Sequence, residues 1–170
     1  AALTTVQLGI VNSVTDVSEF STSQITGLTT ESVASLSTAQ VAALSSSSIT
    51  VLGTDDVSAL SSEQLVALSA TQIKGLGSDD IDALTTEEVK RLLVAQLVTL
   101  STTQVAALGT DDVANLTPSK LAFMGTAQIA ALTTDDVAGL TTAQLTALTT
   151  SQLVAFGSDD FAALTSSEVA

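Results

Sequence analysis

From Phe20 to its end, the chain repeats every eight residues without losing register. The unit reads Leu-Thr-Thr-x-Gln/Asp-Val-x-Ala, and positions are numbered here from its Leu. Position one is always Leu, Phe or Met, and position six is always Val, Ile, Leu or Phe. Repetition at a fixed period indicates an architecture in which each unit buries its apolar face against its neighbours. We therefore predict one octapeptide-repeat solenoid over 1–170, with irregular first repeats in 1–19 and regular octads over 20–170.

Positions two and five of the octad carry a helix-start signal. Position two is Ser or Thr in thirteen of nineteen units, and position five is Gln, Asp or Glu in sixteen. Ser or Thr followed three residues later by Gln or Glu is a capping box, in which the hydroxyl and the longer side chain each satisfy a free backbone N–H. In the unit that contains Thr141 and Gln144, the pattern predicts Thr141 as the N-cap.

Two kinds of irregular unit support this assignment. The only proline, Pro118, stands at position three, the first helical residue, where proline is favoured because its missing N–H has no partner in the helix. Glycine, a tolerated cap, replaces Ser or Thr at position two in five units. Those glycines are Gly53, Gly77, Gly109, Gly125 and Gly157, and all but the Gly125 unit have Asp at position five. An acid in the first turn favours the positive end of the helix.

A start signal every eight residues excludes one long helix, because an octad drifts by roughly 80° per repeat around a helix of 3.6 residues per turn. A strand needs alternation with a period of two, which spacings of five and three do not give. The sequence therefore predicts an all-α solenoid of very short helices, about six residues each by the turn geometry. Positions six and one, three apart, lie on one helix face and should point inward. Position eight, usually Ala or Gly, should let neighbouring coils approach closely.

Adjacent aspartates suggest how many helices make one coil. They occur at positions four and five, and their spacings are three, four, three and three octads. The pairs are Asp55–Asp56, Asp79–Asp80, Asp111–Asp112, Asp135–Asp136 and Asp159–Asp160. If they form a stripe, a coil holds roughly three helices. Two helices per coil, as in hairpin solenoids, remain the alternative.

One stretch departs from the pattern. Residues 90–97, Lys-Arg-Leu-Leu-Val-Ala-Gln-Leu, lose the capping hydroxyl because Leu93 occupies position two. Ordinary repeat drift is the favoured reading of this stretch, and the merging of two helices and the docking of a partner are the alternatives. The aromatic side chains of Phe123, Phe156 and Phe161 are expected in the core.

The charge of the chain excludes some partners. Eighteen acidic residues face only four basic ones, Lys74, Lys90, Arg91 and Lys120, for a net charge of −14. Nucleic-acid binding and docking on an anionic membrane both need clustered Lys or Arg, so we expect neither. No apolar run approaches the roughly 18–20 residues that cross a bilayer, so membrane insertion is not expected. The acidic, Cys-free composition suits a secreted protein.

The residue types needed for common catalytic sites are missing. The chain has no His and no Cys, so a His-based triad, a His ligand and a thiol nucleophile are all impossible. We predict no enzyme, no cofactor, and no catalytic, cofactor-binding or metal-site residue. Aspartate pairs such as Asp55 and Asp56 are the one candidate for calcium, which prefers oxygen ligands, but first-turn helix acids also explain them. Ice binding by the Ser/Thr rows is disfavoured, because those hydroxyls are needed as caps and Ser exchanges freely with Thr.

The units at 36–43 (LSTAQVAA), 100–107 (LSTTQVAA) and 140–147 (LTTAQLTA) resemble Leu/Thr/Gln/Ala octapeptide tracts of large secreted or cell-surface bacterial proteins of the adhesin or hemolysin type. The resemblance covers nearly the whole chain and implies an extracellular structural role. We therefore expect a rod, surface filament or matrix element that self-associates end to end. A partner-binding or spacer segment of a larger adhesin, with a cell-surface or matrix partner, is the alternative.

Overall fold

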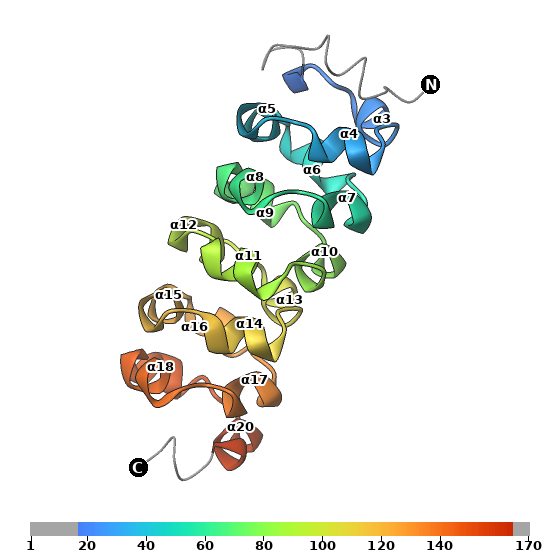
Figure 1. The fold of residues 1–170 in the computed structure, drawn as a ribbon. Coiled ribbons are helices and arrows are strands. Elements are labelled where there is room, and N and C mark those ends of the chain that lie inside the picture. Colours follow the sequence, from blue (N-terminus) through green and yellow to red (C-terminus); the bar gives the residue numbers. More distant parts are fainter. Residues whose placement is uncertain (1–16, 165–170) are drawn as a thin grey trace. The chain divides into compact units, whose positions relative to one another are not determined.

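A computed structural model of the chain describes residues 17–164, and these residues form eighteen short helices and no strand (Figure 1). The chain divides into two compact units, residues 1–84 and 85–170. The helices of the first unit are α3 (Thr22–Ile25), α4 (Thr30–Ala34), α5 (Thr38–Ala43), α6 (Ser46–Thr50), α7 (Thr54–Ser58), α8 (Ser62–Ala67), α9 (Ala70–Lys74) and α10 (Ser78–Asp82). Those of the second are α11 (Thr86–Arg91), α12 (Val94–Leu97), α13 (Thr102–Val105), α14 (Thr110–Asn115), α15 (Pro118–Phe123), α16 (Thr126–Ile129), α17 (Thr134–Ala138), α18 (Thr142–Ala147), α19 (Thr150–Leu153) and α20 (Ser158–Ala163).

Each of these helices occupies one octad and begins at position three, which confirms the predicted start. Thr141 is the N-cap of α18: its hydroxyl accepts from the Gln144 N–H, and the Gln144 side chain accepts from the Thr141 N–H. Pro118 is the first residue of α15, as its missing N–H predicts. The five glycines at position two are also N-caps.

The chain changes direction between helices through ordinary extended backbone. After α14, Leu116 (ψ 139°) and Thr117 (ψ 147°) are both extended, and the Leu116 N–H donates to the Val113 carbonyl at 3.1 Å. Within residues 17–164 there is no positive φ and no cis peptide bond. Any L-residue can therefore form this corner, so position one is free to be a large core residue and position two a cap.

Three helices make one coil, because in each unit a helix packs against the helix three octads further along. In the first unit the rows are α3–α6–α9, α4–α7–α10 and α5–α8. In the second they are α11–α14–α17–α20, α12–α15–α18 and α13–α16–α19. This confirms the predicted solenoid with about three helices per coil, and it rules out the two-helix alternative within the described part of each unit. One continuous array over 1–170 stays a prediction.

Positions six and one form the core, as predicted. Every position-six side chain from Ile25 to Val137 is 0% exposed, and the position-one side chains from Leu28 to Leu148 are at most 9% exposed. Burial of a complete Leu, Ile or Val side chain contributes about 1.5–3 kcal/mol. Because these helices are far too short to be stable alone, this stacked core holds them in helical form.

At position eight, two glycines lie close to the preceding coil. A Cβ added to Gly139, after α17, would lie 2.9 Å from the Thr110 methyl group of α14 in the preceding coil. One added to Gly75, after α9, would lie 3.1 Å from the Thr50 hydroxyl of α6. The prediction that small residues at position eight permit close approach is therefore confirmed at these two glycines.

Gly139→Ala should destabilise the protein by about 1–2 kcal/mol, because the new methyl group overlaps Thr110. The loss is net of the few tenths of a kcal/mol that alanine gains by restricting the unfolded chain. The matched control is Gly139→Ala combined with Thr110→Ser, which removes the methyl group that the new Cβ would meet and keeps the hydroxyl that bonds Asp136. Urea unfolding of both variants measures the difference, and equal midpoints would contradict the close approach.

The structure excludes one alternative reading of residues 90–97 and contradicts the expectation for two of the phenylalanines. Helices α11 and α12 do not merge across Leu93, because the two extended residues Leu92 and Leu93 separate them. Phe123 is 66% and Phe161 53% exposed, whereas Phe156 is buried as expected. Phe123 stands at position eight, which faces solvent whenever its side chain is too large for the contact between coils. Phe161 belongs to α20, and the described residues place no further helix over it. The predicted irregularity in 1–19 falls largely outside the described residues.

Candidate functional site

The most elaborate polar arrangement in the fold surrounds position five, the third residue of each helix. Gln144 shows it fully: its side chain is 1% exposed, and its Oε1 accepts from the Thr141 N–H at 2.9 Å. Its Nε2 reaches the preceding coil and donates to the carbonyls of Val113 and Leu116, both at 2.8 Å. One amide therefore caps the start of its own helix and also donates to carbonyls at the end of α14, in the preceding coil.

The same bridge recurs at other glutamines. Gln72 donates to the Leu44 carbonyl at 2.7 Å, and Gln152 donates to the Met124 carbonyl at 2.7 Å. Gln64 and Gln128 donate in the same way to Leu36 and Leu100. The acceptor is always the position-one carbonyl 28 residues earlier. Helix ends leave carbonyls without intrahelical partners, and this amide row satisfies part of that need.

Aspartate at position five makes a different bridge, because a carboxylate accepts and cannot donate. The Oδ2 of Asp136 accepts from the Thr133 N–H at 2.8 Å, and its Oδ1 accepts from the Thr110 hydroxyl of the preceding coil at 3.0 Å. The hydroxyl donor in this arrangement is a threonine at position three, 26 residues earlier. The other pairs are Thr30 with Asp56, Thr54 with Asp80, and Thr134 with Asp160.

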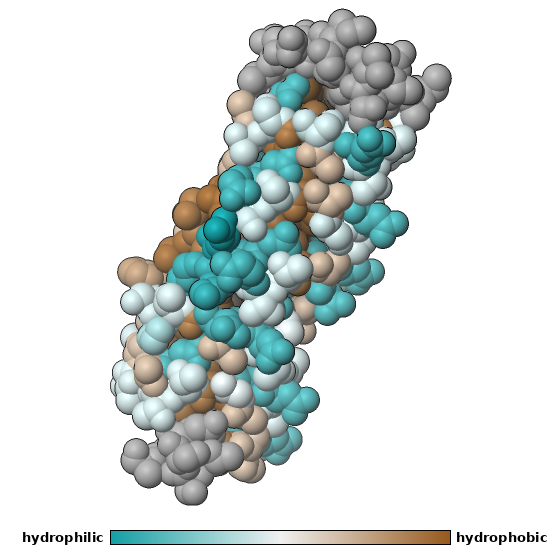
Figure 2. Space-filling model, in the orientation of Figure 1, coloured by the Kyte–Doolittle hydropathy of each residue, from teal (hydrophilic) through white to brown (hydrophobic). Residues whose placement is uncertain are grey.

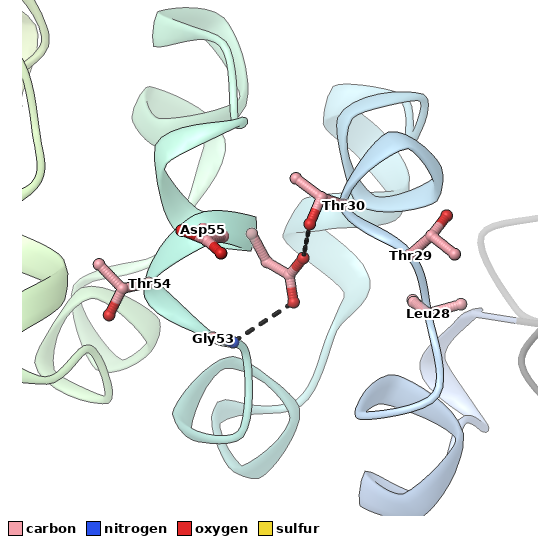
Figure 3. A pocket seen from close by; sticks show the side chains of 7 residues that line it. Leu28, Thr29, Thr30, Gly53, Thr54 and Asp55 are labelled. Atoms are coloured by element: carbon pink, nitrogen blue, oxygen red, sulfur yellow. Dashed lines mark hydrogen bonds between the residues drawn. The ribbon is translucent and has the colours of Figure 1, made fainter.

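An open depression of about 540 Å³ lies at one of these bridges, between α4 and α7. The Asp56 carboxylate there accepts from the Thr30 hydroxyl (2.8 Å) and from the Gly53 N–H (3.3 Å). Figure 3 marks both hydrogen bonds as dashed lines, one ending at Thr30 and one at Gly53. Thr54 points away from the depression, toward its own partner Asp80. The depression is thus a gap between two coils that the Asp56 carboxylate already bridges.

The aspartate pairs do not converge as a metal site would. Both carboxylate oxygens are used in bridges at Asp56, Asp80, Asp136 and Asp160. The position-four aspartates, such as Asp55 and Asp79, are exposed on the outer surface. Among residues 17–164, no group of three or more Asp, Glu, His or Cys side chains is placed to hold a metal ion. Calcium usually takes six to eight oxygen ligands. The structure therefore favours the reading of these pairs as helix caps and coil links.

Asp136→Asn should lower the free energy of unfolding by about 1–2 kcal/mol, because it turns two charge-assisted hydrogen bonds into weaker neutral ones. The matched control is Asp135→Asn at the exposed neighbouring position, which should stay within about 0.5 kcal/mol of the parent. Combining Asp136→Asn with Thr110→Val gives a double-mutant cycle. Additive losses in that cycle would contradict the link between coils.

Lys120, in α15, stands at position five of its octad in place of glutamine. It makes the bond to the preceding coil but not the bond to its own N-cap. Its ammonium group donates to the Lys90 carbonyl at the end of α11, 30 residues earlier, where glutamine would also donate. A lysine has no acceptor, so it cannot close the capping box with Thr117. Desolvation by burial lowers the pKa of Lys120. This ammonium is therefore a weaker substitute for the glutamine amide.

Lys120→Gln should stabilise the protein by about 0.5–2 kcal/mol, because it restores an acceptor for the Thr117 N–H and relieves the partial burial of a charge. Lys74→Gln serves as control, since Lys74 is exposed on α9 and its replacement should change stability by less than about 0.5 kcal/mol. Thermal melts compare the variants. A lower melting temperature for Lys120→Gln would show that the ammonium fits this position better than an amide.

A second surface stands apart from the repeated bridges. Leu93, the N-cap of α12, is 50% exposed; Val98, its C-cap, is 40% exposed; and Phe123, the last residue of α15, is 66% exposed. Helices α12 and α15 pack against each other. Figure 2 shows hydrophobic side chains gathered over α12 at the left edge of the view. Leu93, Val98 and Phe123 are called the α12 patch below.

The octad sequence matches a known repeat. The family model of the ALTTAQ repeat matches residues 14–46, 38–70, 49–86, 62–94, 105–142, 115–150 and 137–170. Together these matches span 14–94 and 105–170, which is most of the chain. The chain belongs to the ALTTAQ repeat family. The resemblance to a Leu/Thr/Gln/Ala repeat protein is thereby confirmed at the level of the repeat.

Membership of the ALTTAQ repeat family identifies the type of repeat but no activity. No curated protein matches the chain at a significant level. Among the described residues, no helix is long and apolar enough to span a membrane. The interval between matches, 95–104, begins within α12 and so falls beside the α12 patch. This interval overlaps the one regular octad that has no Ser, Thr or Gly at position two.

Proposed function

We propose that this ALTTAQ repeat protein is a non-catalytic structural element outside the cell, a rod or filament whose length and stiffness are its function. The observation that carries the proposal is the position-five row. In every described bridge, side chains of one coil are fixed to the backbone or hydroxyls of the coil before it, as Gln144 and Asp136 illustrate. Such links resist sliding and bending between coils, which a load-bearing or spacing element requires.

Absence of suitable chemistry supports the non-catalytic role. His and Cys do not occur in the sequence. Many Ser and Thr hydroxyls at position two, such as Thr141, are already used as helix caps. A nucleophilic hydroxyl needs an adjacent base, and the position-five aspartates nearest to the hydroxyls are engaged in bridges between coils.

The extracellular location is proposed on composition and on the resemblance to surface adhesin and hemolysin-type tracts. A net charge of −14 keeps a long repetitive chain soluble and disfavours both nucleic acid and anionic membranes. Fractionation of the native host with an antibody to the repeat tests this proposal. Recovery of the protein with the cytosol alone would refute it.

Electron microscopy of the purified protein tests the structural role. A structural element that assembles end to end should give filaments of uniform width, because a heterologous contact that does not close propagates. A monodisperse short particle at all concentrations would refute end-to-end assembly.

A spacer or partner-binding segment of a larger adhesin is the second candidate, and the exposed α12 patch is the observation that favours it. Under this reading the purified chain stays monomeric while the patch contacts a different macromolecule. Removal of the patch would then abolish surface retention without changing the mass of the protein in solution.

A further inference from the structure

The α12 patch consists of residues that the repeat does not require. Position two is Ser, Thr or Gly in every regular octad except that of Leu93. Position eight is usually Ala or Gly, yet Phe123 stands there with a ring that is 66% exposed. Both departures lie on α12 and α15, which are in contact with each other. Two independent exceptions on adjoining helices indicate a surface with a use of its own.

These exceptions lower the stability of the fold instead of raising it. Leu93 makes no side-chain cap bond, and a missing Ser or Thr cap costs a helix about 0.5–2 kcal/mol. Its side chain, like that of Phe123, remains largely in water, so burial returns little of that loss. An exposed apolar cluster rimmed by polar residues is typical of an interaction site.

Charge indicates what covers the patch. Lys90, Arg91 and Lys120, three of the four cations in the chain, lie on α11 and α15, and α15 packs against α12. Glu87 on the same α11 surface contacts Lys90 at 3.7 Å and Arg91 at 3.5 Å. The rim therefore carries both signs of charge. Lys74 is the one cation of the chain that lies elsewhere, so most of the remaining charge is acidic.

A surface with an apolar centre and a rim of both signs is complementary to itself. In an isologous contact, a residue i touches j of the partner while j touches i, so Glu87 of each copy can face Lys90 and Arg91 of the other. The exposed ion pairs within one copy are worth only about 0–1 kcal/mol, so exchanging partners costs little. Apolar centres with polar rims are also the usual anatomy of homodimer interfaces.

We propose that the α12 patch is a lateral contact through which two copies of this chain pair about a two-fold axis, with Leu93, Val98 and Phe123 at the centre. This deepens the proposed structural function, because it joins rods or filaments side by side where end contacts only lengthen them. The patch is small, so the contact is weak in a single pair and becomes strong when many copies lie in parallel.

The absence of cysteine from the chain allows a direct test. Leu93→Cys and Phe123→Cys are each exposed to a mild oxidant, alone and mixed, and disulfide-linked dimers are counted on non-reducing gels. The matched control is Val154→Cys, at a valine that follows α19 and is 76% exposed, more than either patch position. A disulfide forms only when the Cα atoms approach within about 7 Å. Linked dimers from the patch positions well above the control support the proposal, and equal rates overturn it.

Sedimentation velocity of Leu93→Ser/Phe123→Ala completes the test. Both changes restore residues that the repeat normally uses, so the fold should be at least as stable and only the patch is lost. We expect the dimerisation constant to weaken about tenfold or more. Unchanged dimerisation, or a wild-type protein that is monomeric up to the highest soluble concentration, overturns the proposal. Filaments in electron micrographs report the end contact separately, so a failure of one proposal is distinguishable from a failure of the other.

Discussion

Gln144→Leu will lower the free energy of unfolding by about 3–4 kcal/mol, although leucine is a good helix former of similar size. The substitution removes the acceptor of the Thr141 N–H and the donor to the carbonyls of Val113 and Leu116. Each buried polar group left without a partner costs about 1–3 kcal/mol, and part of that cost is offset by burying an apolar side chain. Urea unfolding followed by circular dichroism measures the loss.

The matched control is Gln24→Leu in α3, at the same position of the octad. Gln24 also accepts from its N-cap, Ser21, at 2.9 Å, but its side chain is exposed and water can replace the lost bond. We expect a loss of about 0.5–1 kcal/mol there. If both variants lose the same amount, the bridge between coils contributes nothing beyond the capping box.

Ile129→Ala will cost about 3–4 kcal/mol, within the range for deleting a fully buried aliphatic side chain. The side chain is 0% exposed at position six of α16, which packs between α13 and α19. Because each coil contacts only its neighbours, the damage should stay local. Amide hydrogen exchange should therefore accelerate most in α13, α16 and α19.

Ala130→Gly is a control for the change in helix propensity, since Ala130 is exposed and directly follows α16. It should cost at most about 1 kcal/mol. Uniform acceleration of exchange over all coils of the second unit in Ile129→Ala would contradict the nearest-neighbour picture. It would mean that the unit unfolds only as a whole.

The helix boundaries and the core could be predicted from the octad because local chemistry determines them. A capping hydroxyl, a reciprocal Gln and a proline at the first helical residue each act within a few residues of the helix start. The roles of Thr141, Gln144 and Pro118 can therefore be predicted from the sequence. The core role of positions one and six can be predicted for the same reason, since they are three residues apart on one helix face. The number of helices per coil followed from a longer period, the spacing of the Asp pairs.

The bridges between coils could not be predicted in the same way. The capping box explains Gln144 with one of its two amide atoms, and nothing within the octad shows that the other atom has a partner 28 residues earlier. For the carboxylates a signal did exist: a threonine stands at position three, 26 residues before each of Asp56, Asp80, Asp112, Asp136 and Asp160. That regularity becomes meaningful only once the coil length is known.

Composition predicts that Phe123 lies in the core, and this is wrong because its position in the octad, position eight, determines where the side chain lies. A rare aromatic residue in a chain with few of them suggests the core, but position eight lies at the contact between coils and has room only for a small side chain. Arg91 and Asn115, the other large residues at position eight in this region, are exposed as well. The correct inference from the repeat was that a large side chain there must turn outward.

The three-helix coil has a consequence for how such genes change length. A duplication or deletion of three octads, 24 residues, returns each position-five side chain to an equivalent partner, whereas one octad shifts the Thr and Asp of a bridge into different rows. Recombination in steps of 24 residues should therefore be nearly neutral. The interval from Asp80 to Asp112 is one octad longer than a coil, which is the trace that a single-octad insertion between them would leave. Leu93 lies inside that interval.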